Sequence, residues 1–158
     1  MVKLTIDNIK VEVEDGSTIL QAARKIGGKV VPPAMCYYSG LKGSGGKCRT
    51  CLVEVTHSSA KDPRPMNKLV ASCSTPVQEG MEVRNLTSPE VIGARKGVVE
   101  FLLLNHPLDC PVCDQAGECD LQDLSFGFGM DETATVEERR EFQVIDIGEE
   151  IKLHMNRC

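Results

Sequence analysis

Residues 36–55 read CYYSGLKGSGGKCRTCLVEV and hold three cysteines in a glycine-rich loop that runs into an apolar stretch. Cys36 stands alone, whereas Cys48 and Cys51 form a C-x2-C pair, whose two thiolates a tight turn can direct at one metal ion. Cys73 completes the pattern C-x11-C-x2-C-x21-C. Four cysteines in this arrangement predict a metal centre.

The glycines of this loop indicate which kind of metal centre the loop would hold. Bridging sulfides of an iron–sulfur cluster accept hydrogen bonds from backbone N–H groups, and residues without a Cβ let the backbone approach closely. The glycines expected to do so are Gly40, Gly43, Gly45 and Gly46. The order of a lone cysteine, a close pair and a distant cysteine is also that of plant-type [2Fe–2S] ferredoxins, although the first gap is longer here. Structural zinc is the alternative, although zinc sites usually use two close cysteine pairs.

The residues around this loop predict an α+β fold. Period-two alternation over residues 4–6 and 11–13 indicates a β-hairpin, and residues 19–26 carry apolar side chains at helical spacing. Two further strands are expected at residues 52–55 and 81–84. Together they predict a β-grasp, ferredoxin-like domain over residues 1–86.

A second motif, H-x3-C-x2-C-x5-C, follows a predicted helix that begins at Pro89 and stops before Pro107. Its candidate ligands are His106, Cys110, Cys113 and Cys119. Three thiolates and one imidazole suit zinc or iron, and a neighbouring ferredoxin-like domain favours a [4Fe–4S] cluster. We expect a small, mainly helical domain over residues 87–130, with a partly helical segment at 120–128.

The charged residues around the second motif are acidic. Acidic residues surround it, and no Lys or Arg lies between residues 105 and 125. Negative charge disfavours an added electron, so these acids are expected to lower the reduction potential of the cluster.

Composition excludes several functions. The 158-residue chain has a net charge of −5 and a pI of about 5.2, which argues against nucleic acid as a main partner. Its three basic pairs are predicted to be solvated helix faces: Arg24-Lys25, Arg95-Lys96 and Arg139-Arg140. No apolar run approaches the roughly 18 residues of a membrane span, and the strand-like start suggests no export signal, which favours metal ligation over disulfides. No nucleotide-binding loop or nucleophile–base motif is found, so no catalytic residue is assigned.

The chain resembles a known family in both motifs. FLLLNHPLDCPVCDQAGECDLQD, residues 101–123, is similar to the histidine–cysteine motif of the large iron–sulfur subunit of complex I, the respiratory NADH:quinone oxidoreductase. Residues 36–55 resemble the [2Fe–2S] motif of the same subunit. The resemblance implies that Cys36, Cys48, Cys51 and Cys73 hold a [2Fe–2S] cluster and that His106, Cys110, Cys113 and Cys119 hold a [4Fe–4S] cluster.

The resemblance also implies partners and a location. Electrons would come from NADH through a flavin on a neighbouring subunit and move along a chain of clusters toward quinone, at the cytoplasmic or matrix side of the membrane. Residues 131–158 are expected to be a connector, because Cys158 resembles the first ligand of a further cluster that this sequence does not complete. His57 and His154 are expected to be surface residues.

Three rival interpretations stay open at this point. The same modules occur in NAD-linked hydrogenases and formate dehydrogenases, which would change the parent enzyme but not the clusters. A zinc-stabilised interaction module would have no redox role. An extracellular module with four disulfides would bind no metal at these cysteines.

Overall fold

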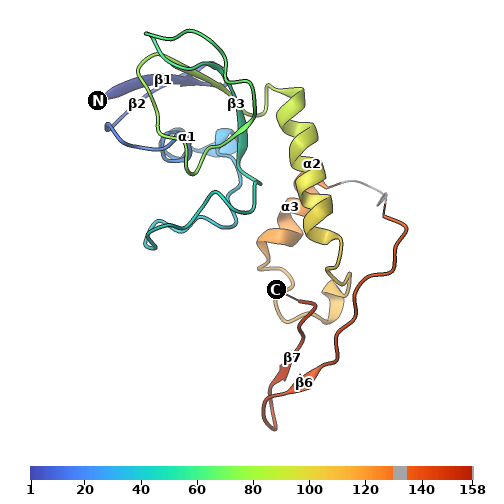
Figure 1. Ribbon diagram of the computed structural model, residues 1–158. Coiled ribbons are helices and arrows are strands. Elements are labelled where there is room, and N and C mark those ends of the chain that lie inside the picture. The colour runs from blue at the N-terminus through green and yellow to red at the C-terminus, as the bar shows by residue number, and fades with distance from the viewer. Residues whose placement is uncertain (130–134, 158) are drawn as a thin grey trace. The chain divides into compact units, whose positions relative to one another are not determined.

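The computed structural model describes residues 1–129 and 135–157, and the chain divides into two compact units (Figure 1). Unit 1 is Met1–Val98 and unit 2 is Val99–Cys158. Helix α2 (Pro89–Leu103) begins in the first unit and ends in the second. Among the described residues, no helix has both the length and the apolar character that crossing a membrane requires.

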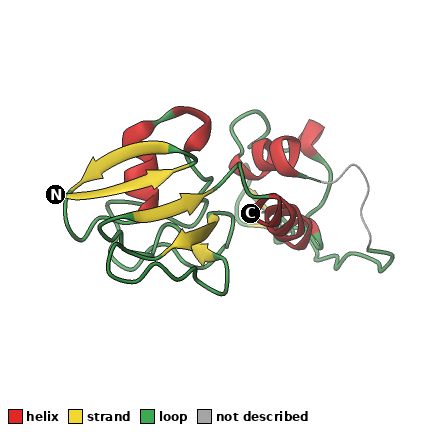
Figure 2. Ribbon diagram, turned by 90° about the horizontal axis from the view of Figure 1, so that it is seen from above, coloured by secondary structure: helices red, strands yellow, loops and turns green. Residues whose placement is uncertain are grey.

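Unit 1 is built on a five-stranded mixed sheet with the order β2-β1-β5-β3-β4. Its strands are β1 (Val2–Ile6), β2 (Ile9–Val13), β3 (Leu52–His57), β4 (Val70–Ala71) and β5 (Met81–Arg84). β1 pairs antiparallel with β2 and parallel with β5, and the other pairs are antiparallel. Helix α1 (Ile19–Ile26) accompanies the sheet (Figure 2), so the predicted α+β class is confirmed.

Local chemistry explains the hairpin and the first helix. Asp7 and Asn8 have positive φ angles of 46° and 67°, which suit a two-residue turn between antiparallel strands. The Thr18 side chain accepts a hydrogen bond from the Gln21 backbone N–H, and the Gln21 side chain accepts one from the Thr18 backbone N–H. Gly27, at φ 82°, ends α1, and the short 3₁₀ helix η1 (Gly28–Val30) follows.

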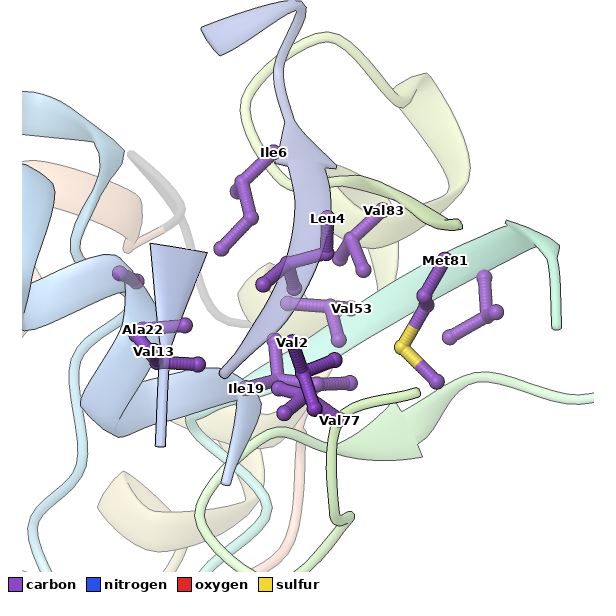
Figure 3. Packing of buried hydrophobic residues seen from close by; sticks show 12 residues of the cluster. Val2, Leu4, Ile6, Val13, Ile19, Ala22, Val53, Val77, Met81 and Val83 are labelled. Carbon is purple, nitrogen blue, oxygen red and sulfur yellow. The ribbon is translucent and has the colours of Figure 1, made fainter. Parts of the chain in front are cut away.

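The apolar core of unit 1 lies between the sheet and α1. Figure 3 shows side chains from β1, β3, β5 and α1 pointing into one shared volume. The buried members are Val2, Leu4, Ile6, Val13, Ile19, Ala22, Ala23, Val53, Val55, Val77, Met81 and Val83. Burying one large aliphatic side chain stabilises the folded state by about 1.5–3 kcal/mol. The core therefore fixes the strands of the sheet, and with them the strand ends to which the cysteine-containing loops are attached.

Unit 2 contains the end of α2, the 3₁₀ helix η2 (Cys110–Val112), helix α3 (Asp120–Phe128), and a hairpin of β6 (Ile145–Asp146) and β7 (Lys152–Leu153). The predicted helical segment at 120–128 is confirmed. In the predicted connector, residues 135–141 form no helix, and residues 131–134 lie outside the described residues.

The basic pairs differ from the sequence prediction at two places. Arg95 is fully buried, so the prediction of a solvated side chain is wrong for it, while Lys96 is exposed. Arg95 lies four residues after Val91 and four before Val99, both buried, and therefore shares their face of α2. Arg139-Arg140 is exposed but lies outside any helix.

Asp7 joins the hairpin turn to the chain beyond β5. Its carboxylate accepts hydrogen bonds from the backbone N–H groups of Asn85 (2.7 Å), Leu86 (3.0 Å) and Thr87 (3.4 Å), and from the Thr87 hydroxyl (2.6 Å). Burial alone would raise the pKa of Asp7, but these hydrogen bonds together hold its pKa below the usual value.

Replacing Asp7 by Asn is expected to lower the free energy of unfolding by about 1–3 kcal/mol at neutral pH, because a charged acceptor of several hydrogen bonds is lost. Since the folded-state pKa lies below 3.8, the contribution of Asp7 is complete above that pH and is lost as the pH falls through the folded value. The difference between wild type and D7N, measured by urea unfolding, should stay constant from about pH 8 to about pH 5.

Asp15→Asn is the matched control, because Asp15 is an exposed carboxylate that accepts a bond from the adjacent Gly16 (3.0 Å). It should change the free energy of unfolding by less than about 0.5 kcal/mol. A D7N variant as stable as D15N would contradict the role given to Asp7, and so would a difference that grows as the pH falls.

Candidate metal centres

The four cysteines of the first motif all lie in unit 1, on the long loop before β3 and on the turn after β4. Cys51 and Cys73 are buried, and their sulfur atoms lie 3.3 Å apart. Cys36 and Cys48 are partly exposed. The structure thus brings two predicted ligands from distant parts of the sequence side by side, with two more on the same loop.

The N-terminus of α1 positions the Cys73 turn. The backbone N–H of Ile19 donates to the Thr75 carbonyl (3.0 Å), and that of Leu20 donates to the Ser72 carbonyl (2.9 Å). These two donors would otherwise be unpaired in the first turn of the helix. Cys73 is therefore held from both sides by the folded core of unit 1.

Backbone N–H groups of the glycine-rich loop point at cysteine sulfurs. Gly46 N–H donates to Cys73 Sγ at 3.0 Å, and the N–H groups of Lys47 and Cys48 both donate to Cys36 Sγ at 3.3 Å. Iron-bound sulfur accepts hydrogen bonds from backbone N–H groups of this kind. The glycine-rich loop thus directs three backbone N–H groups at cysteine sulfur atoms.

Gly45 lies where a side chain would not fit. A Cβ at this position would lie 3.1 Å from Cys73 Sγ and 3.2 Å from the Tyr37 ring, and the backbone has φ +96°. Gly43 also has a positive φ, +76°, but a Cβ there would meet nothing within 4 Å. Close approach of backbone to sulfur therefore applies to Gly45, whereas Gly43 serves the turn alone.

Cys48 and Cys51, the two thiols of the C-x2-C pair, have pKa values shifted in opposite directions. Burial raises the pKa of Cys51, and the adjacent Cys73 sulfur adds to the rise. Burial alone would raise the pKa of Cys48, but hydrogen bonds from Thr50 and with Cys36 lower it overall. Iron binding replaces the thiol proton, and the positive charge of the metal offsets the burial of the thiolate.

These observations form a fit test for the [2Fe–2S] cluster. The donor set is all thiol, two of its sulfurs are adjacent, and three backbone N–H groups already point at sulfur. The seven described cysteines are free thiols, which disagrees with the disulfide interpretation for that part of the chain. The residues of the first motif therefore fit the cluster.

The second motif lies in unit 2 on successive turns between α2 and α3. Backbone bonds from Val112 to Asp109 (3.0 Å) and from Cys113 to Cys110 (3.2 Å) shape η2. Cys119 stands immediately before α3, at its N-cap position. Glycine at position 117, with φ +85°, allows the turn between the last two cysteines.

His106, Cys110, Cys113 and Cys119 are thus neighbours along the backbone, but their side chains do not form one metal-holding group. Within residues 1–129 and 135–157, no set of three or more His, Cys, Asp and Glu side chains is arranged to hold a single ion. This includes the four cysteines of the first motif, whose fit rests on the adjacent sulfurs and on the N–H groups directed at them. The chemistry of the donor set, three thiols and one imidazole, fits a [4Fe–4S] cluster. Cys158 lies outside the described residues.

A cation near the second motif was missed from the sequence. Arg157 donates to the Asp109 carboxylate through Nε at 3.0 Å and through a second guanidinium nitrogen, although 48 residues separate the two. The hydrogen bond from Arg157 lowers the pKa of Asp109. The acidic surroundings predicted from residues 105–125 are therefore partly neutralised by a residue outside that window.

Arg95 was also missed, although it is buried beside the first motif. It donates to the carbonyls of Thr50 (3.0 Å) and Leu52 (3.1 Å), which lie on either side of Cys51. The sequence signal for its burial was its helical spacing from Val91 and Val99, since an i, i+4, i+8 series shares one face.

Family models match both parts of the chain. Residues 1–88 match the model described as "2Fe-2S iron-sulfur cluster binding domain", and residues 95–134 match "NADH-ubiquinone oxidoreductase-G iron-sulfur binding region". Because the first match covers more than half of the chain, the chain belongs to the family of 2Fe-2S iron–sulfur cluster binding domains. The predicted cofactors, a [2Fe–2S] and a [4Fe–4S] cluster, are confirmed by these two matches.

Related proteins are similar to this chain over its whole length. The chain is 47% identical over 158 residues to the "NADH-ubiquinone oxidoreductase 75 kDa subunit" of Reclinomonas americana and 50% identical over 159 residues to the "NADH-ubiquinone oxidoreductase 78 kDa subunit, mitochondrial" of Neurospora crassa. A subunit of the NADH-quinone oxidoreductase of Rickettsia bellii is also 47% identical over 158 residues. These matches cover 99–100% of the chain but only 20–21% of the relatives, so the chain spans about a fifth of their length.

A solved structure shares the fold. It is described as NAD+-reducing [NiFe]-hydrogenase in the H2-reduced state, and it matches with a TM-score of 0.78 at 27% identity. The match covers 99% of this chain and 61% of that one. The predicted resemblance to complex I is therefore confirmed by the relatives, and a hydrogenase shares the same architecture.

Proposed function

We propose that this chain is a one-electron relay of an NADH:quinone oxidoreductase, passing electrons from NADH toward quinone. The observation that carries the proposal is the 47% identity to a subunit of such an enzyme across all 158 residues, including both ligand motifs. When bound, each iron–sulfur cluster accepts and releases one electron at a time. The chain itself supplies ligands, burial and hydrogen bonds, and no catalytic residue.

The first ligand set is Cys36, Cys48, Cys51 and Cys73 for the [2Fe–2S] cluster. The adjacent sulfurs of Cys51 and Cys73 and the N–H groups directed at Cys36 and Cys73 support it. These donors are fixed by the core before an electron arrives, so little reorganisation accompanies a change of charge.

The second ligand set is His106, Cys110, Cys113 and Cys119 for the [4Fe–4S] cluster. Its spacing and the family match over residues 95–134 support it. We assign residues 1–86 to the first cluster domain, 87–130 to the second, and 131–158 to a connector toward a further cluster.

The partners belong to the proposal as well. The matched relatives are named as subunits, which supports a multisubunit assembly. In that assembly a flavin-containing, NADH-binding subunit would deliver electrons to this chain. The assembly would lie at the cytoplasmic side of a bacterial inner membrane, or at the matrix side in a mitochondrion.

The test is reduction by NADH of the assembled complex from the source cells, followed by low-temperature EPR. The proposal predicts that the [2Fe–2S] and [4Fe–4S] signals of this chain appear with NADH, and that added quinone reoxidises them. Clusters that dithionite reduces but NADH does not would contradict the NADH relay. Clusters that NADH reduces but quinone leaves reduced would contradict the acceptor.

A second candidate is the electron module of an NAD-linked hydrogenase or formate dehydrogenase. The likeness to the hydrogenase structure, with a TM-score of 0.78, is the observation that favours it. The lower identity, 27% against 47%, ranks it second. Reduction of the same clusters by hydrogen or formate in the isolated complex would favour this candidate instead.

A further inference from the structure

Arg95 is a buried cation that the two ligand sets do not use. Among the described residues it is the largest fully buried side chain, and it belongs to unit 1, on the first part of α2. A guanidinium is rarely buried unless its N–H groups are hydrogen-bonded, because it loses its hydration. The hydrogen-bond partners of Arg95 therefore indicate its role in the protein.

Two of those partners lie on either side of a proposed cluster ligand. Arg95 Nε donates to the Thr50 carbonyl at 3.0 Å, and Nη2 donates to the Leu52 carbonyl at 3.1 Å. The planar guanidinium thus fixes the peptide group between Thr50 and Cys51 and the one between Leu52 and Val53, which flank Cys51 in the sequence. Lysine has one nitrogen on a flexible chain and cannot reproduce this fork.

The third partner ties Arg95 to the frame of unit 1. Nη2 also donates to Asn85 Oδ1 at 2.7 Å, and Asn85 Nδ2 donates to the Val30 carbonyl at 3.0 Å. The backbone N–H of Asn85 in turn donates to Asp7 at 2.7 Å. The position of the guanidinium is therefore set by groups outside the cysteine loop.

The charge of Arg95 interacts with the same ligand. Arg95 is fully buried, and its guanidinium bonds the carbonyls of the two residues that flank Cys51, so its positive charge lies close to that ligand. A positive charge in a buried site acts strongly, because little water screens it. Adding an electron to a cluster held by Cys51 would be favoured by this charge.

We propose that Arg95 is a positioning residue of the [2Fe–2S] site, which fixes the backbone around Cys51 and raises the reduction potential of the cluster held there. This inference rests on the proposed ligand role of Cys51. It adds a residue outside both cysteine motifs to the machinery of electron transfer.

Three variants of the full chain in its complex test it. Arg95→Gln removes the charge, Arg95→Lys keeps the charge without the fork, and Lys96→Gln removes a charge from the exposed neighbour. Each is read by EPR-monitored redox titration and by the line shape of the reduced [2Fe–2S] signal. The [4Fe–4S] signal in the same sample reports that the protein is folded and loaded.

Arg95→Gln is expected to shift the [2Fe–2S] midpoint to a more negative potential, while Lys96→Gln leaves it near the wild-type value. Arg95→Lys is expected to keep the midpoint closer to wild type but to alter the EPR line shape, because one carbonyl beside Cys51 loses its donor. Equal shifts in Arg95→Gln and Lys96→Gln would overturn the proposal.

If Arg95→Gln yields protein without its clusters, Arg95→Lys alone tests the proposal. A wild-type line shape in Arg95→Lys would then overturn the positioning role, and an altered one would support it. Failure of the ligand assignment is a separate result, because Cys51→Ala would then retain the [2Fe–2S] signal. An unchanged Arg95→Gln in a protein whose Cys51→Ala has lost that signal refutes only the role of Arg95.

Discussion

Replacing Cys73 by alanine is expected to remove the [2Fe–2S] cluster and to leave the [4Fe–4S] cluster in place. Cys73 is buried, its sulfur lies 3.3 Å from that of Cys51, and it accepts the Gly46 N–H at 3.0 Å. A cluster with three thiolate ligands in a site built for four loses most of its stability. The bound iron should fall from about six to about four per chain, with loss of the [2Fe–2S] EPR signal.

Cys119→Ala is the reciprocal variant and serves as the control. It lies in the other unit and in the other motif, so it should remove about four iron and retain the [2Fe–2S] signal. Loss of both signals in both variants would indicate unfolding rather than ligand loss. Retention of the [2Fe–2S] signal in Cys73→Ala would contradict the first ligand set.

Gly45→Ala is expected to abolish most of the [2Fe–2S] signal without touching a ligand. The new Cβ would lie 3.1 Å from Cys73 Sγ, well inside an ordinary contact of about 3.5–4.0 Å. The sulfur cannot retreat easily, because Cys51 and the core confine it. The backbone at φ +96° adds a penalty of about 1–2 kcal/mol for any residue with a side chain.

Gly43→Ala separates these two effects. Gly43 has φ +76°, and nothing lies within 4 Å of the position that a Cβ would take, so alanine there meets the backbone penalty without the clash. We expect Gly43→Ala to retain most of its [2Fe–2S] signal and to unfold at a slightly lower urea concentration. Equal cluster loss in both variants would show that backbone strain, and not the approach to sulfur, decides occupancy.

The parts of the fold that local chemistry specifies could be predicted from the sequence. The turn residues between the first two strands and the capping residues of α1 act within a few positions, so their pattern is visible along the chain. The cysteine spacing is also visible along the chain and predicted two metal centres, and the family resemblance of the two motifs implied the two cofactors that the family matches confirm.

The rest depends on contacts between distant residues. The parallel pairing of β1 with β5 joins residues almost eighty positions apart, and no turn signal encodes it. The burial of Arg95 follows from which face of α2 meets the core, which outweighed the usual exposure of arginine. The pair Arg157–Asp109 likewise brings together charges that the sequence separates by 48 residues.

Iron and sulfide analysis with low-temperature EPR on anaerobically purified, dithionite-reduced protein tests the central claim most directly. The account predicts about six iron and about six sulfide per chain, with one [2Fe–2S] and one [4Fe–4S] signal. About two iron and a single signal would contradict the second cluster. A colourless protein with zinc in place of iron would contradict the electron relay as a whole.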